Sequence, residues 1–174
     1  MMTEASPQET LTPAHVLAYL KARGLAGEVV RFSQPTPTVE EAARVAGVAP
    51  EQIVKTLLFF VRYDDGTEQP WLVLAIGPQR VDRRILARFF GVGRKRVRLA
   101  RADEVPAWTG YAVGAVPPLA HRQPLPALMD ERILAFSEVW AGGGAEDTLL
   151  RMTPQAIRKA LGAQTIRLVE EDPS

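Results

Sequence analysis

The sequence predicts one domain of mixed α/β class. Its 174 residues, 47% hydrophobic and 24% charged, have an ordinary globular composition and suffice for one sizeable core. Short apolar runs bounded by turn residues alternate with segments that begin at capping residues and end at glycines, so both strands and helices are expected. No linker-like change in composition and no internal repeat divides the chain. We therefore expect residues 1–11 to be frayed and residues 12–174 to form a single domain.

Four helices are predicted from their start and stop signals. Each begins after a residue whose side chain can cap the first turn and ends at a glycine that can adopt left-handed backbone. The expected caps are Thr12, Thr38, Asp82 and Thr153, and the expected stops are Gly24, Gly47, Gly91 and Gly162.

Apolar runs rich in β-branched and aromatic residues predict strands between these helices. The runs lie at residues 28–32, 53–61, 71–76, 125–129, 137–141, 149–152 and 164–169. The turn Asp64-Asp65-Gly66 separates the second run from the third. These two strands are therefore expected to pair as an antiparallel hairpin.

Lys55 is the anomaly in the apolar run 53–61. Apart from Lys55 and Thr56, every residue of this run is apolar. Because side chains alternate across the pleat, Lys55 shares a face with Leu57 and Phe59. A lysine is almost never fully buried unless it is paired, so its ammonium is expected in a polar cavity or beside an acidic partner. A strand-end lysine that extends to solvent is the alternative.

The one charge block of the chain is basic. It holds eight cationic residues and no acidic residue: Arg83, Arg84, Arg88, Arg94, Lys95, Arg96, Arg98 and Arg101. Spread over a helix face, a turn and a following strand, these residues can follow a phosphate backbone, where counterion release makes binding salt-sensitive. The alternative is a solvated amphipathic face, but the absence of acidic residues favours a polyanion.

Two glycine-bearing segments predict shaped loops. Residues 110–134 combine glycines, prolines and apolar residues in a way that no simple strand or helix tolerates. Gly114 and Pro117-Pro118 suit either a pocket wall, where a ligand approaches main-chain amides, or a tight crossover between strands. The glycines 142–144 at a strand end offer N–H groups to an oxyanion or phosphate, or else form a flexible turn.

The sequence lacks the residues that several classes of chemistry require. Without cysteine the chain has no disulfide, thiol catalysis or thiolate metal site, which fits a cytoplasmic protein. The two histidines, His15 and His121, form no metal-binding pattern and are expected at the surface, so we expect neither metal nor cofactor. No apolar stretch approaches the roughly 20 residues of a spanning helix. Residues 1–10 lack the basic and apolar regions of a signal peptide, so a soluble, intracellular protein without a membrane partner is expected.

Six motifs in a fixed order resemble one known family. They are TVEEAARVAG, EQIVKTLLFF, GYAVGAVPPLA, LPALMDERIL, VWAGGG and LLRMTPQAIRKALGA. Together they resemble the YbaK and prolyl-tRNA-synthetase-associated family of trans-editing aminoacyl-tRNA deacylases. The resemblance implies a single mixed α/β (α+β) domain with a twisted, mostly antiparallel mixed sheet flanked by helices. It also implies hydrolysis of the ester between a wrong, small amino acid and the 3′ end of a tRNA.

The resemblance assigns the site residues by position. The expected catalytic residues are Lys55, on the family's functional lysine, Gly114, in the G-x-x-x-P pocket loop, and the opposite glycine pair Gly142 and Gly143. The expected substrate-binding residues are Phe32, Thr56, Ala115, Val116, Pro117, Pro118 and Ala141. The expected tRNA contacts are Arg83, Arg84, Arg88, Arg94, Lys95, Arg96 and Arg98.

Two departures leave the amino acid open. Cysteine-specific relatives often carry Ser-Gly-Gly where this chain has Ala141-Gly142-Gly143, and some alanine-specific relatives carry Asn where it has Thr56. The edited tRNA, the oligomeric state and the need for a synthetase partner are equally open.

The implied mechanism is attack of water on the aminoacyl ester. Backbone amides of the Gly114 loop or of Gly142-Gly143 stabilise the oxyanion, and Lys55 anchors the substrate. No general base is visible, so a ribose hydroxyl of the tRNA or a substrate side chain is expected to assist proton transfer. A non-catalytic module that holds aminoacyl-tRNA or an amino acid is the competing hypothesis, favoured by Ala141 in place of a polar residue. General nucleic-acid binding through the basic block is a third.

Overall fold

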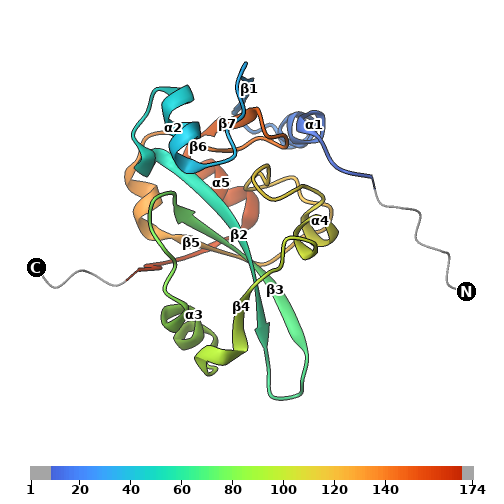
Figure 1. Cartoon of the computed structure of the whole chain (residues 1–174), viewed down its shortest axis with the longest axis vertical. Helices are drawn as coiled ribbons and strands as arrows, with labels where there is room; N and C mark the ends of the chain where they lie inside the picture. Colours follow the sequence, from blue (N-terminus) through green and yellow to red (C-terminus); the bar gives the residue numbers. More distant parts are fainter. Residues whose placement is uncertain (1–8, 170–174) are drawn as a thin grey trace, which may run out of the picture.

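Eight strands form one mixed sheet in the computed structural model, which describes residues 9–169 (Figure 1). The order across the sheet is β1-β7-β6-β2-β3-β5-β8, and β4 pairs with β2 off this path. Four of the seven pairings are antiparallel and three are parallel. The predicted mixed, mostly antiparallel sheet is confirmed.

The seven predicted runs all form strands, with small shifts at their ends, and the strand expected within the basic block is the eighth. They are β1 (Glu28–Arg31), β2 (Ile53–Arg62), β3 (Glu68–Ile76), β4 (Val97–Leu99), β5 (Ala127–Asp130), β6 (Val139–Gly142), β7 (Thr148–Met152) and β8 (Gln164–Ile166). The hairpin of β2 and β3 is confirmed. The last strand ends three residues earlier than predicted, because Leu168 leaves the ladder: its N–H donates to the Asp130 carboxylate and its carbonyl accepts from Asp82.

Four of the five helices begin and end where their caps predict. They are α1 (Pro13–Arg23), α2 (Val39–Ala46), α3 (Arg83–Phe90) and α5 (Pro154–Leu161), with α4 (Glu104–Thr109) between β4 and β5. Single turns of 3-10 helix precede β2 and β4 and follow β5, at η1 (Pro50–Gln52), η2 (Arg94–Arg96) and η3 (Glu131–Ala135). No helix was predicted at α4, because it is only six residues long and has Pro106 in its first turn. Within residues 9–169, no helix has the length and apolarity needed to cross a membrane.

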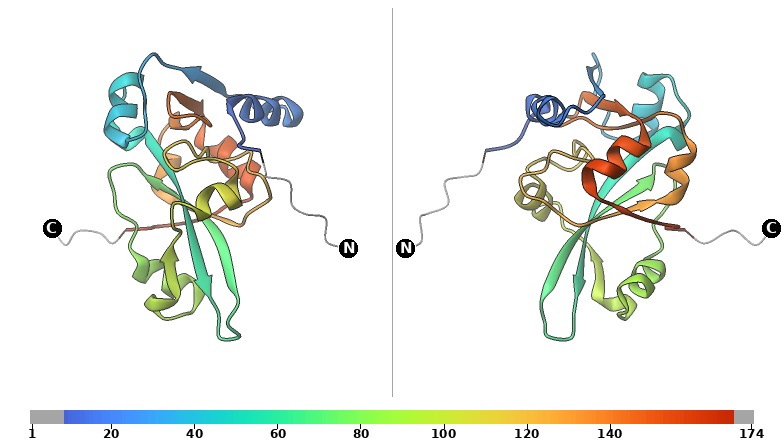
Figure 2. Two further views of the ribbon diagram at one scale, coloured as in Figure 1. Left: turned by 45° about the vertical axis from the view of Figure 1, so that its right-hand side comes forward. Right: turned by 180° about the vertical axis from the view of Figure 1, so that it is seen from behind.

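Helices lie on both faces of the sheet (Figure 2). Side chains of β2 alternate between these faces, as the pleat requires. Val54, Leu58 and Phe60 point into the largest core cluster, to which α1 and α5 contribute. Phe59 points the opposite way, into a second cluster with α3, and Ile53 joins a third with α2. Lys55, between Ile53 and Phe59 in this alternation, therefore lies between two apolar clusters rather than inside one.

The segment before α1 is held against the loop after α4. The Leu11 N–H donates to the Gly110 carbonyl at 2.9 Å, and the Arg122 guanidinium donates to the Glu9 carbonyl. Of the segment expected to be frayed, residues 1–8 lie outside the described residues. Residues 9–11 are tied to the domain by these contacts.

Candidate functional site

A cavity of about 490 Å³ opens beside the middle of β2. This volume lies in the range of small-molecule sites, roughly 300–1,000 Å³. Three further segments meet there: residues 36–39 before α2, residues 99–105 from β4 to α4, and residues 113–116 of the glycine-bearing loop. Gly142 and Leu149 close it from β6 and β7.

The sheet is interrupted at this cavity. On the edge of β2 away from β3, β6 pairs with residues 53–54 and β4 with residues 59–61. No described strand pairs with residues 55–58 on that edge. The Leu58 carbonyl accepts from Ala100 there, and main-chain groups of an antiparallel strand alternate between its edges. The N–H and C=O of Thr56 therefore point to the open edge, where the cavity lies.

Lys55 is the only charged residue in the wall of this cavity within the described chain. Its side chain is partly buried, and no carboxylate of residues 9–169 lies within ion-pair distance of it. Burial lowers the pKa of Lys55, the charge of Arg80 lowers it further, and Glu40 opposes both. Lys55 lines a cavity as expected, but the wall of that cavity is largely apolar rather than polar, and no acidic partner meets the ammonium within the described residues.

The loop at Gly114 presents main-chain amides beside the cavity. The Ala115 N–H donates to the Ala112 carbonyl at 3.0 Å, and Gly114 has φ of 88°, as the third residue of a type II turn requires. Within residues 9–169, the N–H groups of Gly114 and Val116 have no protein acceptor. Both residues line the cavity, and neither amide is used in a hydrogen bond within the described chain.

Hydrogen bonds close this loop from behind. The Arg122 N–H donates to the Thr109 carbonyl at 2.9 Å and joins the two ends. The Tyr111 hydroxyl, fully buried, donates to the Ala120 carbonyl at 2.8 Å, and burial raises the pKa of Tyr111 to about 12. Ala120 has φ of 65°, a strained value for a residue with a side chain. These contacts fix the loop in one shape, as in a compact Ω-loop.

His121 belongs to this support: it is half-buried, not simply at the surface as expected. Its Nε2 lies 2.7 Å from the Pro117 carbonyl, and its ring meets the Tyr111 ring edge-on at 6.4 Å. Burial lowers the pKa of His121 to about 4. The imidazole is therefore neutral at pH 7. Because a carbonyl only accepts, Nε2 carries the proton and donates it to the loop.

We expect the free energy of unfolding to fall at low pH, where protonation of His121 is favoured. The unfolded histidine binds a proton below about pH 6.5 and the folded one only near pH 4, so the unfolded state gains protons first as the pH falls. Lowering the pH from 7 to 5 should cost about 2 kcal/mol through this residue. Urea unfolding at both pH values checks this, with His121→Gln, which keeps a donor but does not titrate, as control. An equal loss in the two proteins would contradict it.

The three consecutive glycines, 142–144, are used mainly for packing and for hydrogen bonds within the protein. A side chain on Gly142 would lie 2.9 Å from the Val116 carbonyl carbon and closer still to its oxygen. The Gly143 N–H donates to Thr148 and the Gly144 N–H to Ala115, at 3.0 and 2.9 Å. The amide of Gly143 is therefore occupied, and the expected oxyanion contact from it is not available.

The structure brings only part of the expected site together. Lys55, Thr56, Gly114, Val116 and Gly142 line the cavity. The other members of the expected set lie behind the wall, where they pack against the protein: Ala115, Pro117, Pro118, Ala141 and Gly143.

Phe32 does not line the cavity either. Its ring lies 6.1 Å from that of Trp140, and its N–H donates to the Asp147 carbonyl. The Phe32 side chain therefore packs in the small core beneath α2.

Sequence reasoning missed two of the walls. In the first of these walls, residues 36–38, only Thr38 was expected to have a role, as a helix cap. In the second, residues 99–105, only the charge of the basic block was noted. Neither segment carries a motif of its own. A Cβ added at Gly114 would lie 3.5 Å from the Pro37 side chain, so the two loops are in contact. Because they are far apart in sequence, this contact exists only in the folded chain.

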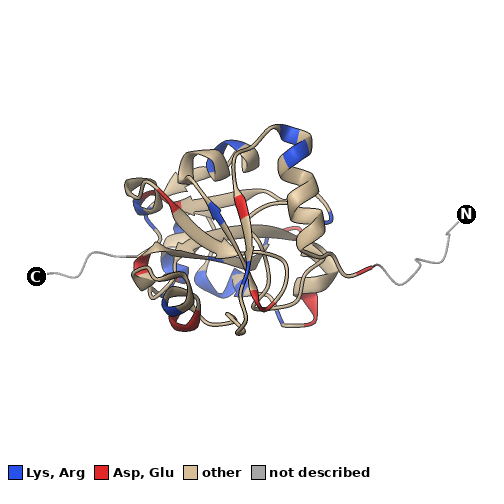
Figure 3. Cartoon of the chain, turned by 90° about the horizontal axis from the view of Figure 1, so that it is seen from above, with Lys and Arg blue, Asp and Glu red and all other residues tan. Residues whose placement is uncertain are grey.

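The basic block is less isolated than its sequence indicates. Figure 3 shows acidic residues interspersed with basic ones over the fold. Arg84 pairs with Asp82 at 2.9 Å and Arg96 with Asp64 at 2.8 Å, and Arg98 binds Glu68 and Glu104. None of the block's cationic residues lines the cavity. Their expected contact with tRNA stays a prediction.

A comparison with known families shows to which family this domain belongs. A model described as an aminoacyl-tRNA editing domain matches residues 33–160. The chain belongs to this editing-domain family. Every segment of the cavity wall falls within the matched residues, and the resemblance seen in the motifs is confirmed.

Similar proteins agree with this membership. A solved structure described as a trans-editing enzyme for prolyl-tRNA synthetase is 37% identical, with 97% of this chain and 100% of that chain covered and a TM-score of 0.80. The Enterococcus faecalis protein EbsC, named for deacylation of Cys-tRNA(Pro) and Cys-tRNA(Cys), is 22% identical over 141 residues, 81% of this chain and 82% of its own. A proline–tRNA ligase of Nitratidesulfovibrio vulgaris is 31% identical over 120 residues, 67% of this chain and 20% of the ligase.

Metal ligands do not gather in this editing domain. Residues 9–169 contain no group of three or more His, Cys, Asp or Glu side chains placed to hold an ion.

Proposed function

We propose that this editing domain hydrolyses mischarged aminoacyl-tRNA, acting on the 3′ ester of a small amino acid. Family membership supports the reaction class. The observation that carries the proposal for this chain is the cavity at the open edge of β2, with one unpaired cation and two unpaired amides in its wall. The substrate implies a cytoplasmic protein with tRNA as its partner, acting alone or beside a synthetase.

The chemistry follows from these groups. A water oxygen attacks the ester carbonyl carbon, and the developing oxyanion accepts hydrogen bonds from the N–H groups of Gly114 and Val116. The bond to the ribose oxygen then breaks and a proton passes to that oxygen, which releases the amino acid and the free 3′ end. Lys55 anchors the substrate through the terminal phosphate or the ester carbonyl. Its desolvated ammonium interacts more strongly with an anion than an exposed lysine would.

No side chain of the cavity wall is suited to remove the proton from the attacking water. The wall of the described cavity contains neither histidine nor carboxylate, and His121 donates into the loop from behind it. The proton therefore passes to a group of the substrate, for which a ribose hydroxyl of the tRNA is the nearest candidate.

We expect the rate of hydrolysis to fall as the amino acid grows. Apolar side chains from Leu58, Leu72 and Val105 enclose the cavity, so larger amino acids are excluded by size. One methylene changes such selection by only about 1–3 kcal/mol, so neighbouring sizes should overlap. Following ester loss from one tRNA charged with glycine, alanine, serine, cysteine, valine or phenylalanine measures this. No ester lost faster than in buffer would contradict the proposal.

The competing proposal of a non-catalytic binding module loses its main support. It drew on Ala141 in place of a polar residue, but Ala141 is buried and lies outside the cavity wall. Tight binding of charged tRNA without ester loss in the same panel would support the non-catalytic module instead.

A further inference from the structure

A second cavity, of about 340 Å³, lies on the other side of the wall formed by β4. It is bounded by the β2–β3 hairpin, η2 and the start of the segment that leads to α4. Its lining is almost entirely charged, and we call it the basic cleft: Arg62, Gly66, Glu68, Lys95, Arg96, Arg98 and Arg101. Arg62 comes from β2, outside the basic block of the sequence, and the fold adds it to that block.

The basic cleft and the apolar cavity share one segment of chain. Arg98 and Arg101 line the cleft, whereas Leu99, Ala100 and Ala102 line the cavity. Leu99 lines the cavity, is 53% exposed, and follows Arg98 of the cleft directly in the chain. A chain-like ligand that extends from the cavity past Leu99 would meet the cleft.

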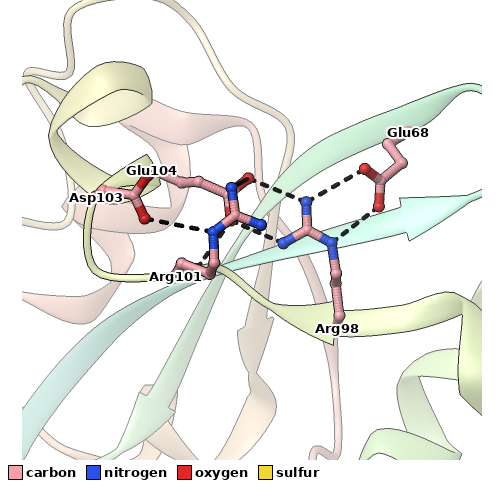
Figure 4. A network of polar contacts seen from close by, with 5 residues as sticks. All are labelled: Glu68, Arg98, Arg101, Asp103 and Glu104. Atoms are coloured by element: carbon pink, nitrogen blue, oxygen red, sulfur yellow. Dashed lines mark hydrogen bonds and ion pairs between the residues drawn. The ribbon is translucent and has the colours of Figure 1, made fainter.

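Arg98 shapes the cleft but has little charge to offer a ligand. Figure 4 shows its guanidinium between Glu68 and Glu104, with nitrogen–oxygen distances of 3.0 and 2.7 Å. It also stacks on the Phe60 ring at 4.4 Å, and its hydrogen bonds lower the pKa of Glu104 to about 2. Two charge-assisted hydrogen bonds and a cation–π contact fix the position of this side chain, so its role is structural.

The other four cations are available. Arg62 and Lys95 are exposed and form no ion pair within residues 9–169. Arg96 pairs with Asp64, whose side chain is 98% exposed. Arg101 pairs at 3.4 Å with the exposed Asp103 and, at a longer 3.7 Å, with Glu104. Exposed pairs of this kind are weak and exchange readily, so a phosphate can replace either carboxylate.

We propose that the basic cleft binds the phosphates of the tRNA strand that precede the terminal nucleotide. The inference rests on the proposed function, which puts the aminoacyl ester in the cavity. A single strand carries one charge per nucleotide, and the four cations of the cleft beside the cavity can follow its path. The arginines of α3, Arg83, Arg84 and Arg88, do not line the cleft, so the inference does not depend on them.

Two substrates with the same ester separate the cleft from the cavity. One is charged tRNA, and the other is the same amino acid esterified to adenosine, which has no preceding phosphate. In Arg62→Gln/Lys95→Gln we expect KM for charged tRNA to rise about tenfold with kcat within twofold. The slope of log(kcat/KM) against log salt should flatten by about 1.4, or 0.7 for each lost phosphate contact. Hydrolysis of the adenosine ester should stay within twofold of the wild type.

The matched control is Arg158→Gln/Lys159→Gln on α5, which removes the same charge from exposed residues that line neither cavity. It should behave as the wild type on both substrates. An unchanged KM for charged tRNA in the cleft variant, or an equal loss on both substrates, would overturn the inference.

Failure of the proposed function gives a different result. If the wild type hydrolyses neither ester, binding of uncharged tRNA still tests the cleft. The cleft variant should then bind about tenfold more weakly than the α5 variant with a flatter salt slope. Equal affinity of the two variants would reject the cleft.

Discussion

Replacing Lys55 by methionine should abolish deacylation and leave the fold intact. Methionine keeps the apolar stem and removes the one charge in the cavity wall. Removing a single preorganised electrostatic contact from an active site typically lowers the rate by on the order of 10²–10³. We expect a loss of this size in single-turnover hydrolysis of charged tRNA.

The same substitution should not lower the free energy of unfolding. The charge of Lys55 is partly desolvated, as its lowered pKa records, and no described carboxylate pairs with it. An apolar residue there relieves that desolvation. Lys159→Met, exposed on α5, is the matched control and should change neither rate nor stability. Parental turnover in Lys55→Met would remove this lysine from the mechanism.

Gly142→Ala should damage both the pocket loop and the rate. The added methyl group would collide with the Val116 carbonyl, which is backbone and moves only with the loop. Overpacking of this kind costs about 1–3 kcal/mol of stability. The displaced amides of Gly114 and Val116 should lower kcat by roughly 10²-fold, because small displacements of catalytic groups have effects of that order.

Gly93→Ala provides the control for this second change. Gly93 has ordinary backbone, with φ of −72°, and no atom lies within 4 Å of an added side chain. It should retain wild-type stability and turnover, measured by urea unfolding and single-turnover hydrolysis. If Gly142→Ala matched Gly93→Ala in both assays, the packing of Gly142 against the loop would not matter to the site.

The sequence predicts well those elements that local chemistry determines. Thr38, Asp82 and Thr153 each accept a hydrogen bond from the first turn of their helix, as expected of caps. The hairpin follows from the turn at Asp64-Asp65-Gly66, and the cavity at Lys55 from the improbability of a buried, unpaired lysine.

Long-range contacts account for what the sequence could not predict. The Thr36 loop meets the Gly114 turn only across the fold, and neither segment indicates the other. His121 is half-buried because Tyr111 and Pro117 lie against it, and nothing in the sequence near these residues indicates that contact. The basic block has no acidic residue in sequence, but Glu68 and Glu104 reach Arg98 from β3 and α4.

If the proposed function is correct, the cavity beside Lys55 cleaves the ester that it binds. This is tested by following alanyl-, seryl- and cysteinyl-tRNA with the protein in excess, measuring bound tRNA and remaining ester in the same samples. We expect first-order loss of at least one ester well above the rate in buffer, and in Lys55→Met ester that stays intact. Charged tRNA that binds with every ester lost only at the buffer rate would contradict it.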